Sequence, residues 1–391
     1  MSRNKAIFIL PLLISLIIGV IWTVFSVQFL NQGILWDLGI YEKAVLIFNS
    51  GSNPYEPNFY MSTISPGIGH LFIYQPLILR GMALFGQQLG IVMILLYVGS
   101  LLFFIQSLGN RRAWWFASFF AFAYCGLGTV SIGSGNVTTF LHLILISLLL
   151  RNISRDQITF TAFVVAVILF SLVKPYLIVY LMIPLALTFQ TSLQKRVWQL
   201  TVAAGFIFTG TIIGSGLYFG EEFQAFITAV RTQTIDKHDL GHGIVMYFYE
   251  YYRSAGSLIY RAYLLHFVIL GVFILGTLLL AKRSNLLNKS NFALLLYFLL
   301  TILNPRLKVY DLFPALLALF IYASAFNQSK MVKALFVIAY SLSLSQLVGT
   351  PFFAHTGILS DPLNVYYLTM GLVFLGALPK LLQKPNHALR I

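Results

Sequence analysis

The chain has 391 residues, of which 59% are hydrophobic and only 9% are charged. Soluble globular domains carry roughly a quarter charged residues, so this chain has too little polar surface to cover a water-soluble fold of its size. The composition therefore excludes a soluble enzyme, a disordered protein and a secreted disulfide scaffold. A single cysteine, Cys125, also excludes a disulfide framework and a Cys/His zinc site.

The net charge of +14 arises from 25 Lys and Arg residues against 11 Asp and Glu residues. In a soluble protein this excess would suggest a nucleic-acid partner, but here the basic residues lie in short breaks between long apolar runs. Basic residues in such breaks set the orientation of membrane helices. We therefore expect an all-α integral membrane protein that contacts membrane lipids and binds no nucleic acid.

A helix needs about 20 apolar residues to cross a bilayer. Apolar runs near this length, several of them shorter, predict about 12 transmembrane helices in a single polytopic domain that covers residues 1–391. The N-terminal run is too long for a signal peptide and no small-residue cleavage site follows it, so we predict an uncleaved span. In chain order the predicted spans are 6–27, 88–108, 113–131, 135–150, 157–173, 176–190, 197–219, 257–281, 291–304, 310–326, 331–349 and 363–379.

Segment 70–86 is apolar, but Pro76, Arg80 and Gly86 interrupt it. If it lies at the membrane interface without crossing, 16 of the 25 basic residues fall in short loops or tails on one side, together with both termini. If it crosses, every later basic cluster lies opposite the basic N-terminus, against the positive-inside rule. The sequence therefore predicts an interfacial segment and cytoplasmic termini. The absence of retention signals and disulfides favours a bacterial plasma membrane.

Two long loops, at about 28–87 and 220–256, then face the extracytoplasmic side, together with ten of the eleven acidic residues. Catalytic and binding residues are placed on such loops more often than elsewhere. We therefore expect the functional face of the protein to be the extracytoplasmic one.

Within the first loop, residues 36–51 predict a short amphipathic helix that lies in the membrane interface. One of its faces carries the apolar side chains, among them Leu38, Tyr41 and Val45. Asp37 is a candidate N-cap of this helix, and Gly51 is the residue expected to end it.

Several short motifs occur in a particular order along the predicted outer face. Asp37 follows the first span with Tyr41 four residues later, and a Gly-x-Asn-Pro-Tyr turn at 51–55 precedes a Tyr-x-Pro-Leu element at 74–77. Further along, Gly135-Asn136 opens the fourth span, Lys174-Pro175-Tyr176 follows the fifth, and the Pro-containing turn 304–311 precedes a late span. This order resembles the GT-C superfamily of membrane glycosyltransferases.

The resemblance extends to about residue 325 and is greatest to glycosyltransferase family 87, which includes polyprenyl-phosphate-mannose-dependent mannosyltransferases. That family often has Gly-Gln-x-Asn where this chain has Gly135-Asn136. The resemblance implies a GT-C-like bundle of about 12 helices with interfacial helices in the first loop. It also implies inverting transfer of a hexose, with mannose as the best-known case, from a polyprenyl-phosphate carrier to a hydroxyl of a lipid- or glycan-linked acceptor.

Such a transfer needs a carboxylate to take the acceptor proton, and the resemblance assigns this role to Asp37. The alternatives are that Asp37 is only an N-cap, or that Glu42 or Glu56 in the same loop is the base.

Cations must also stabilise the leaving phosphate. Arg80, Lys174, Arg306 and Lys308 are the candidates at the outer interface, although they could instead extend toward lipid phosphates. We expect further substrate contacts from a second set of polar and aromatic residues, namely Tyr41, Tyr74, Gln75, Asn136, His238 and Tyr310.

Asp236, His238, Asp239 and His242 lie close together in the second long loop. Their spacing is not that of a recognised zinc site, and a lipid-phosphate donor has no diphosphate for a metal to neutralise. We therefore expect neither a metal nor another cofactor, and interpret this stretch as a polar loop that faces the acceptor.

Three other functions compete with glycosyl transfer. A transporter usually has ionisable residues at mid-membrane and internal repeats, and the sequence shows neither. A lipid-linked-oligosaccharide ligase or polymerase shares the many spans and large outer loops, but the Asp after the first span disfavours it. A structural assembly subunit is the third alternative, and it would apply if Asp37 were dispensable.

The predicted topology can be tested with single-cysteine variants in a cysteine-free background. Cysteines placed beside Arg112 and Lys282 should be protected from a membrane-impermeant maleimide added outside the cell, because both positions belong to cytoplasmic loops. Cysteines beside Asn53 and His238 should react. Labelling beside Arg112 from outside would show that the segment at 70–86 crosses the membrane.

Overall fold

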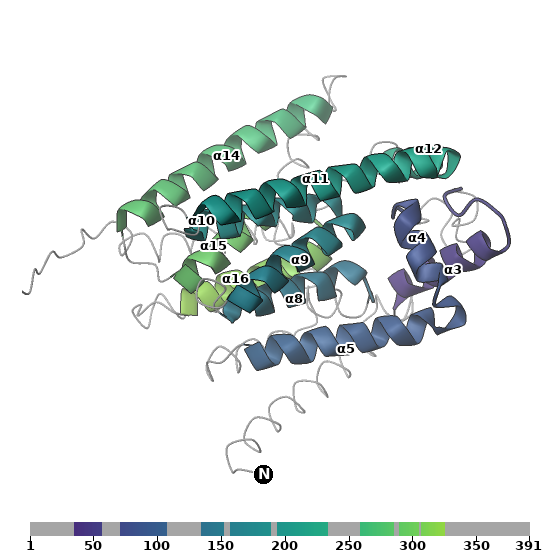
Figure 1. The fold of residues 1–391 in the computed structure, drawn as a ribbon, viewed down its shortest axis with the longest axis horizontal. Coiled ribbons are helices and arrows are strands. Elements are labelled where there is room, and N and C mark those ends of the chain that lie inside the picture. Colours follow the sequence, from purple (N-terminus) through teal and green to yellow (C-terminus); the bar gives the residue numbers. More distant parts are fainter. Residues whose placement is uncertain are drawn as a thin grey trace, which may run out of the picture. The chain divides into compact units, whose positions relative to one another are not determined.

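A computed structural model describes residues 35–56, 71–107, 134–151, 157–188, 194–233, 259–284, 289–304 and 306–324. These residues form helices and turns and contain no strand (Figure 1). The expected all-helical fold is therefore confirmed for the described part of the chain. Its helices are α3 (Trp36–Asn49), α4 (Pro76–Ala83), η2 (Gly86–Gln88), α5 (Leu89–Ser107), α8 (Val137–Leu150), α9 (Gln157–Val173), η3 (Pro175–Leu181), α10 (Met182–Thr188), α11 (Gln194–Tyr218), α12 (Gly220–Arg231), α14 (Ile259–Ser284), α15 (Lys289–Ile302) and α16 (Val309–Ser324).

Two stretches of the described chain are long and apolar enough to cross a membrane, Gly86–Phe104 and Lys195–Tyr218. Their 19 and 24 residues correspond to roughly 28 and 36 Å of helix, close to the thickness of a hydrocarbon core. Only 22% and 11% of their most apolar windows are buried within the protein, which is unlike the core helix of a soluble domain. They coincide with the predicted spans 88–108 and 197–219 and agree with membrane association.

The other described helices also begin and end near predicted spans. α8 and α9 correspond to 135–150 and 157–173, and η3 with α10 covers most of 176–190. α14, α15 and α16 correspond to the three spans predicted between 257 and 326. The predicted spans 6–27, 113–131, 331–349 and 363–379 lie outside the described residues, so the number of twelve stays a prediction.

Segment 70–86 does not form a spanning helix in its described part. Residues 71–75 are not helical, and α4 follows with only eight residues, about 12 Å of helix. Pro76 is at the start of α4, where its missing N–H has no intrahelical partner to lose. A helix this short cannot cross a bilayer, as the charge distribution predicted.

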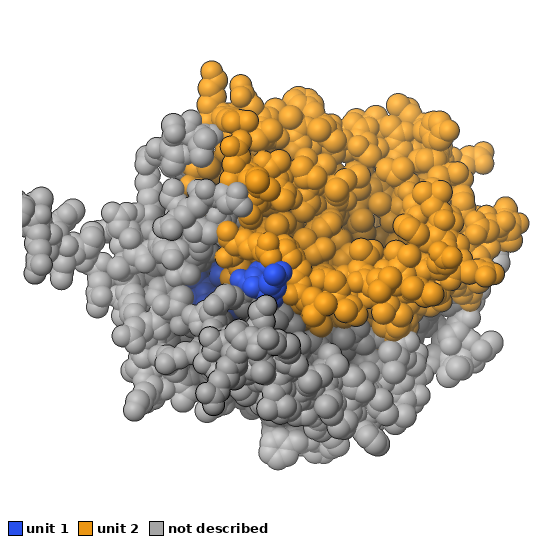
Figure 2. All heavy atoms as spheres, turned by 60° about the horizontal axis from the view of Figure 1, so that its bottom comes forward, with its two compact units in different colours: residues 1–31, 105–131, 241–391 blue, residues 32–104, 132–240 orange. Residues whose placement is uncertain are grey.

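Two compact units divide the chain, shown in different colours in Figure 2. One consists of residues 32–104 and 132–240, and we call it the α3–α12 unit. The other consists of residues 1–31, 105–131 and 241–391, and we call it the α14–α16 unit after its principal described helices. Within the α14–α16 unit, α15 packs along α16, and His266 Nε2 of α14 lies 3.2 Å from the Leu303 carbonyl oxygen.

Candidate functional site

Asp37 lies inside the first turn of α3 and is not the N-cap of this helix. The N-cap of α3 is Leu35, and no side chain caps the helix. Asp37 is already helical, and its backbone N–H donates to the Ser134 carbonyl oxygen at 2.9 Å. The N-cap alternative for Asp37 is therefore wrong, because a backbone acceptor from a distant loop takes the N–H that a cap would satisfy. This leaves the Asp37 carboxylate available to a tertiary partner.

The backbone at the start of α3 packs closely against the loop before α8. Leu35 has a φ of 61°, a left-handed conformation that is uncommon for a residue with a side chain. Gly135 packs against it with a φ of +67°, and a Cβ there would lie 3.0 Å from a methyl carbon of Leu35. Only glycine meets both requirements at position 135. The loop before α8 and the start of α3 are thus fitted to each other.

The rest of α3 follows the amphipathic pattern of its sequence. Leu38, Tyr41 and Val45 are buried, while Glu42 and Lys43 on the other face are exposed. The helix ends as predicted, since Gly51 follows the C-cap with a φ of +78°. The N–H groups of Gly51 and Ser52 donate to Phe48 and Ile47 carbonyls, the pattern of a glycine-terminated helix.

Asn136 holds the Asp37 carboxylate. Its Nδ2 donates to Asp37 Oδ2 at 3.0 Å across 99 residues of sequence, and the two residues are only 5% and 6% exposed. Asn136 Oδ1 accepts from the Thr138 N–H at 2.9 Å and so caps α8. Because the cap fixes which atom of the amide is oxygen, Nδ2 must face Asp37. Asp37 and Gly135-Asn136, two of the motifs along the predicted outer face, are therefore in direct contact.

Two tyrosines, Tyr41 and Tyr74, lie beside the contact between Asp37 and Asn136. The hydroxyls of Tyr41 and Tyr74 lie 2.9 Å apart with their rings edge to face, and the Val137 N–H donates to the Tyr41 oxygen at 3.3 Å. Burial raises the pKa of Tyr41 well above its ordinary value, and the neighbouring Tyr74 and Asp37 raise it further. Tyr41 therefore keeps its proton at neutral pH.

Lys174 joins the group from the turn after α9. Its Nζ lies 4.7 Å from the centre of the Tyr74 ring, a cation–π arrangement. In the same region Gln75 Nε2 donates to the Leu172 carbonyl oxygen, which ties the segment before α4 to the end of α9. We call Asp37, Tyr41, Tyr74, Asn136 and Lys174 the Asp37 cluster. It combines a buried carboxylate with a cation, and all its members come from the α3–α12 unit.

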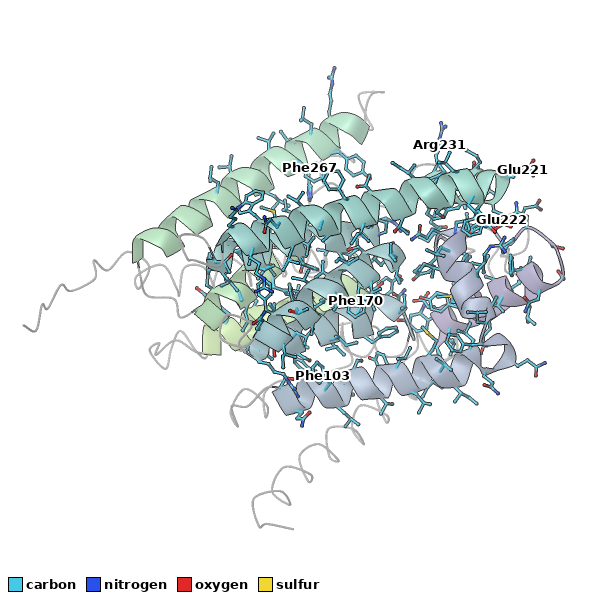
Figure 3. All side chains as sticks on the ribbon, viewed as in Figure 1. Phe103, Phe170, Glu221, Glu222, Arg231 and Phe267 are labelled. Atoms are coloured by element: carbon cyan, nitrogen blue, oxygen red, sulfur yellow. The ribbon has the colours of Figure 1, made fainter. Side chains whose placement is uncertain are left out.

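Arg80, another predicted phosphate ligand, makes a different set of contacts. It forms an ion pair with Glu222 of α12 at 2.7 Å, with the two side chains 42% and 37% exposed. Its guanidinium also lies over the rings of Phe48 and Phe219. Figure 3 shows Glu222 on the side of α12 that faces α4. Arg80 thus joins α4, α12 and α3, and the Glu222 carboxylate already balances its charge.

Arg306 and Lys308 belong to the turn before α16, and Tyr310 belongs to the first turn of α16, all in the α14–α16 unit. Asp311 organises this turn, because its Oδ2 accepts from the Lys308 N–H at 3.0 Å and from Asn304 Nδ2 at 3.3 Å. The side chains of Arg306, Lys308 and Tyr310 are half-buried. The predicted residue His238 lies outside the described residues.

Two contributors were not among the sequence candidates. The Tyr55 hydroxyl donates to the Tyr74 carbonyl oxygen at 2.9 Å, and Tyr55 itself follows a turn in which Asn53 Oδ1 accepts its N–H at 3.0 Å. Its place in the Asn-Pro-Tyr motif was the available signal. Ser134 had no such signal, because it contributes through its backbone oxygen and through an Oγ that accepts from the Asn136 N–H at 3.2 Å.

The contact between Asp37 and Asn136 predicts a pH-dependent defect in Asn136→Asp. The new carboxyl can still cap α8, but it replaces the donor 3.0 Å from Asp37 Oδ2 with a second acid. Paired acids retain a proton more readily when folded than when unfolded, so stability falls as pH rises. We expect a loss of about 2 kcal/mol at pH 8 that shrinks by pH 5 in thermal unfolding.

Asn136→Ser is the matched control, because serine caps a helix equally well without adding an acid. Because Asn136→Ser leaves the buried Asp37 carboxylate without its amide donor, its loss of stability should also grow from pH 5 to pH 8, but less steeply than that of Asn136→Asp, which adds a second acid. Identical pH profiles for the two variants would contradict the contact.

Comparison with known proteins supplies no relative for this chain: it matches no protein-family model, no curated protein and no solved structure. The resemblance to GT-C glycosyltransferases therefore stays a prediction, and the Asp37 cluster is the structural basis for a proposed chemistry.

Proposed function

We propose that this chain is a polytopic membrane glycosyltransferase that moves a hexose from a polyprenyl-phosphate carrier to an acceptor hydroxyl, with inversion, on the extracytoplasmic face. The observation that carries the proposal is the buried Asp37 carboxylate held by Asn136 Nδ2 at 3.0 Å. Asp37 and Asn136 belong to two of the motifs on which the resemblance rests. The contact between Asp37 and Asn136 supports the proposed function independently of the order of the motifs.

In this reaction the acceptor oxygen attacks the anomeric carbon and gives its proton to Asp37. The bond between the anomeric carbon and the phosphate oxygen breaks, and the polyprenyl phosphate leaves with the electron pair. Asn136 orients the carboxylate by binding one of its oxygens, so that little reorganisation is needed on proton transfer. Lys174 is the cation of the cluster and supplies positive charge for the leaving phosphate.

The membrane arrangement is part of the same proposal. We infer about 12 spans with both termini in the cytoplasm of a bacterium and the Asp37 cluster at the outer surface of its plasma membrane. The length and exposure of α5 and α11 support this arrangement, as does the shortness of α4. A general base at that surface can reach both a lipid-linked donor and a lipid- or glycan-linked acceptor.

Asp37→Asn separates catalysis from structure. The new amide oxygen can still accept from Asn136 Nδ2, so the fold should hardly change. Proton acceptance is lost, so transfer of radiolabelled mannose from polyprenyl-phosphate mannose should fall by roughly 10²-fold or more, while donor binding persists. The control is Glu42→Gln, because Glu42 is exposed on the opposite face of α3 and should transfer at the parent rate. Parent-level transfer by Asp37→Asn would remove Asp37 as the base.

Lys174→Gln tests the leaving-phosphate site. Loss of a hydrogen bond to a charged group costs about 1.5–3 kcal/mol, so the donor concentration needed for half-maximal transfer should rise by about 10- to 100-fold. Arg80→Gln is the comparison, because Glu222 already neutralises Arg80, and it should change donor dependence much less. An unchanged Lys174→Gln with a weakened Arg306→Ala would instead assign the phosphate to the turn before α16.

A further inference from the structure

The turn that carries Lys174, at residues 172–176, connects the end of α9 to η3. Lys174 is the N-cap of η3 and has extended backbone angles, with φ −131° and ψ 96°. Its N–H donates to the Phe170 carbonyl oxygen at 2.8 Å, and its carbonyl oxygen accepts from the Leu177 N–H at 3.0 Å. These contacts are local, so they fix the shape of the turn but not its distance from the Asp37 carboxylate.

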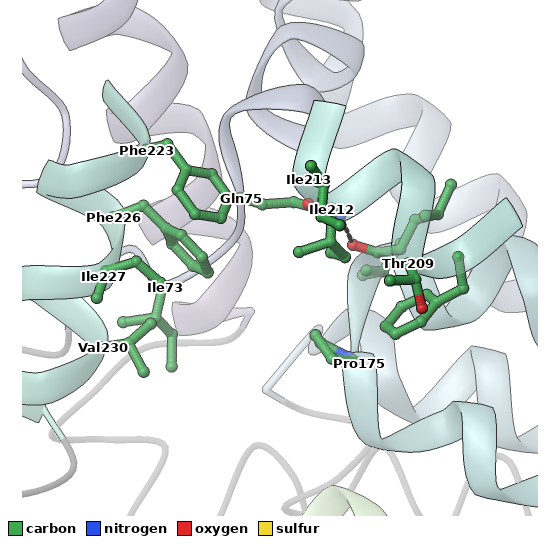
Figure 4. A pocket seen from close by; sticks show the side chains of 13 residues that line it. Ile73, Gln75, Pro175, Thr209, Ile212, Ile213, Phe223, Phe226, Ile227 and Val230 are labelled. Atoms are coloured by element: carbon green, nitrogen blue, oxygen red, sulfur yellow. Dashed lines mark hydrogen bonds between the residues drawn. The ribbon is translucent and has the colours of Figure 1, made fainter. Parts of the chain in front are cut away.

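Two buried side chains from other elements hold this turn in place. On its N-terminal side, Gln75 Nε2 donates to the Leu172 carbonyl oxygen, drawn as a dashed line in Figure 4. On its C-terminal side, His142 Nε2 lies 2.9 Å from the Tyr176 hydroxyl oxygen, a hydrogen bond between α8 and η3. Gln75 is 3% exposed and His142 is 0% exposed. Lys174 lies between these two points of attachment.

Packing does less to hold the remaining side of the turn. Leu172, Val173 and Pro175 line an apolar cavity of about 400 Å³ beside α11 and α12 (Figure 4). Side chains that face a cavity lack the close contacts that fix a fully packed residue. The hydrogen bonds made by Gln75 and His142 therefore contribute more to the position of this turn than they would in a densely packed place.

Helix α8 connects the turn to the proposed base. Its N-cap Asn136 donates to Asp37 Oδ2 at 3.0 Å, and His142 follows six residues later, about 9 Å along the helix axis. Twelve of the fourteen residues of α8 are buried, and so densely buried a helix opens only rarely. One rigid helix thus holds the Asp37 carboxylate at its start and the turn of Lys174 further along.

Packing alone does not explain a histidine at position 142. An apolar side chain would fill this place in α8 without the cost of burying an imidazole. The His142 ring lies 6.3 Å from the Tyr176 ring and 6.0 Å from the Tyr180 ring between their centres, and its Nε2 is bonded to the Tyr176 hydroxyl. Because His142 is fully buried, it can act on a substrate only through such a neighbour.

We propose that His142 is a positioning residue, which fixes the distance between the Lys174 ammonium and the Asp37 carboxylate by holding the Tyr176 hydroxyl. This inference rests on the proposed function for the role of Lys174, but not for its placement. A lysine side chain is flexible, so its charge stays in one place only if the backbone that carries it is fixed. The leaving phosphate and the acceptor hydroxyl lie on opposite sides of one anomeric carbon, so the spacing of cation and base affects the geometry of attack.

The first test measures sugar transfer by the full-length protein in nanodiscs as the concentration of polyprenyl-phosphate mannose is varied. His142→Leu removes the hydrogen bond to Tyr176 and should raise the donor concentration for half-maximal transfer by about fivefold, the size of one net hydrogen bond. His142→Gln supplies a group that can donate or accept and should restore the parent value. Tyr176→Phe removes the same bond without altering α8 and should match His142→Leu.

Two controls separate positioning from a general effect on the fold. Ser147→Ala removes another buried side-chain hydrogen bond of α8, from Ser147 Oγ to the Leu143 carbonyl oxygen, and should leave the donor dependence unchanged. In a Lys174→Gln background, His142→Leu should cause no further change, because the charge that it positions is gone. A fivefold effect that persists without Lys174, or that Ser147→Ala reproduces, would overturn the proposal.

The second test needs no activity and reads the position of Lys174 directly. Its Nζ lies 4.7 Å from the centre of the Tyr74 ring, so after reductive methylation with ¹³C-formaldehyde its methyl resonance should be shifted upfield by the ring current. Lys174→Gln identifies this resonance by its loss. The upfield shift should persist in His142→Gln and should move toward the value of the other lysines in His142→Leu.

The resonance of Lys174 also separates failure of this inference from failure of the proposed function. A parent protein that transfers no sugar, but whose Lys174 resonance responds to His142→Leu and not to His142→Gln, would contradict the proposed function and support the positioning. An unchanged upfield shift in His142→Leu would overturn the positioning, whatever the transfer activity.

Discussion

The hydrogen bond between Asn136 Nδ2 and Asp37 Oδ2 is the contact on which the local structure depends. The same asparagine caps α8, so the start of that helix and the orientation of the carboxylate are set together. Beside it, the Asp37 N–H ends on Ser134, and the left-handed turns at Leu35 and Gly135 let the two segments approach closely. A buried acid is stable only when it is paired in this way, which explains why so much of the neighbourhood is fitted around it.

From this contact the arrangement extends in two directions. Tyr41, whose pKa the nearby Asp37 helps to raise, is hydrogen-bonded to Tyr74, and Lys174 stacks on the Tyr74 ring. The cluster thus holds both the base of the proposed reaction and a positive charge for its leaving group. The segment that carries Tyr74 also carries Gln75, whose Nε2 donates to the Leu172 carbonyl oxygen and ties this segment to the end of α9.

Local chemistry allowed much of this to be predicted. The apolar runs matched the described helices closely, and the predicted amphipathic pattern of α3 and its end at Gly51 matched the structure. Both could be predicted because hydrophobic periodicity and helix termination depend on residues that are neighbours in the sequence. The N-cap interpretation of Asp37 failed because its competitor, the Ser134 carbonyl oxygen, comes from a distant loop. For the same reason the pairing of Arg80 with Glu222, 142 residues away, left no signal that a single sequence could reveal.

The most direct test of the account is a cryo-electron-microscopy density map of the protein with a non-transferable polyprenyl-phosphate mannose analogue bound. We expect the phosphate to lie against Lys174 and the anomeric carbon to face Asp37, with room for an acceptor oxygen about 3–3.5 Å from that carbon. A phosphate bound elsewhere, with the Asp37 carboxylate still enclosed by Asn136 and no sugar beside it, would contradict the assignment of Asp37 as the base.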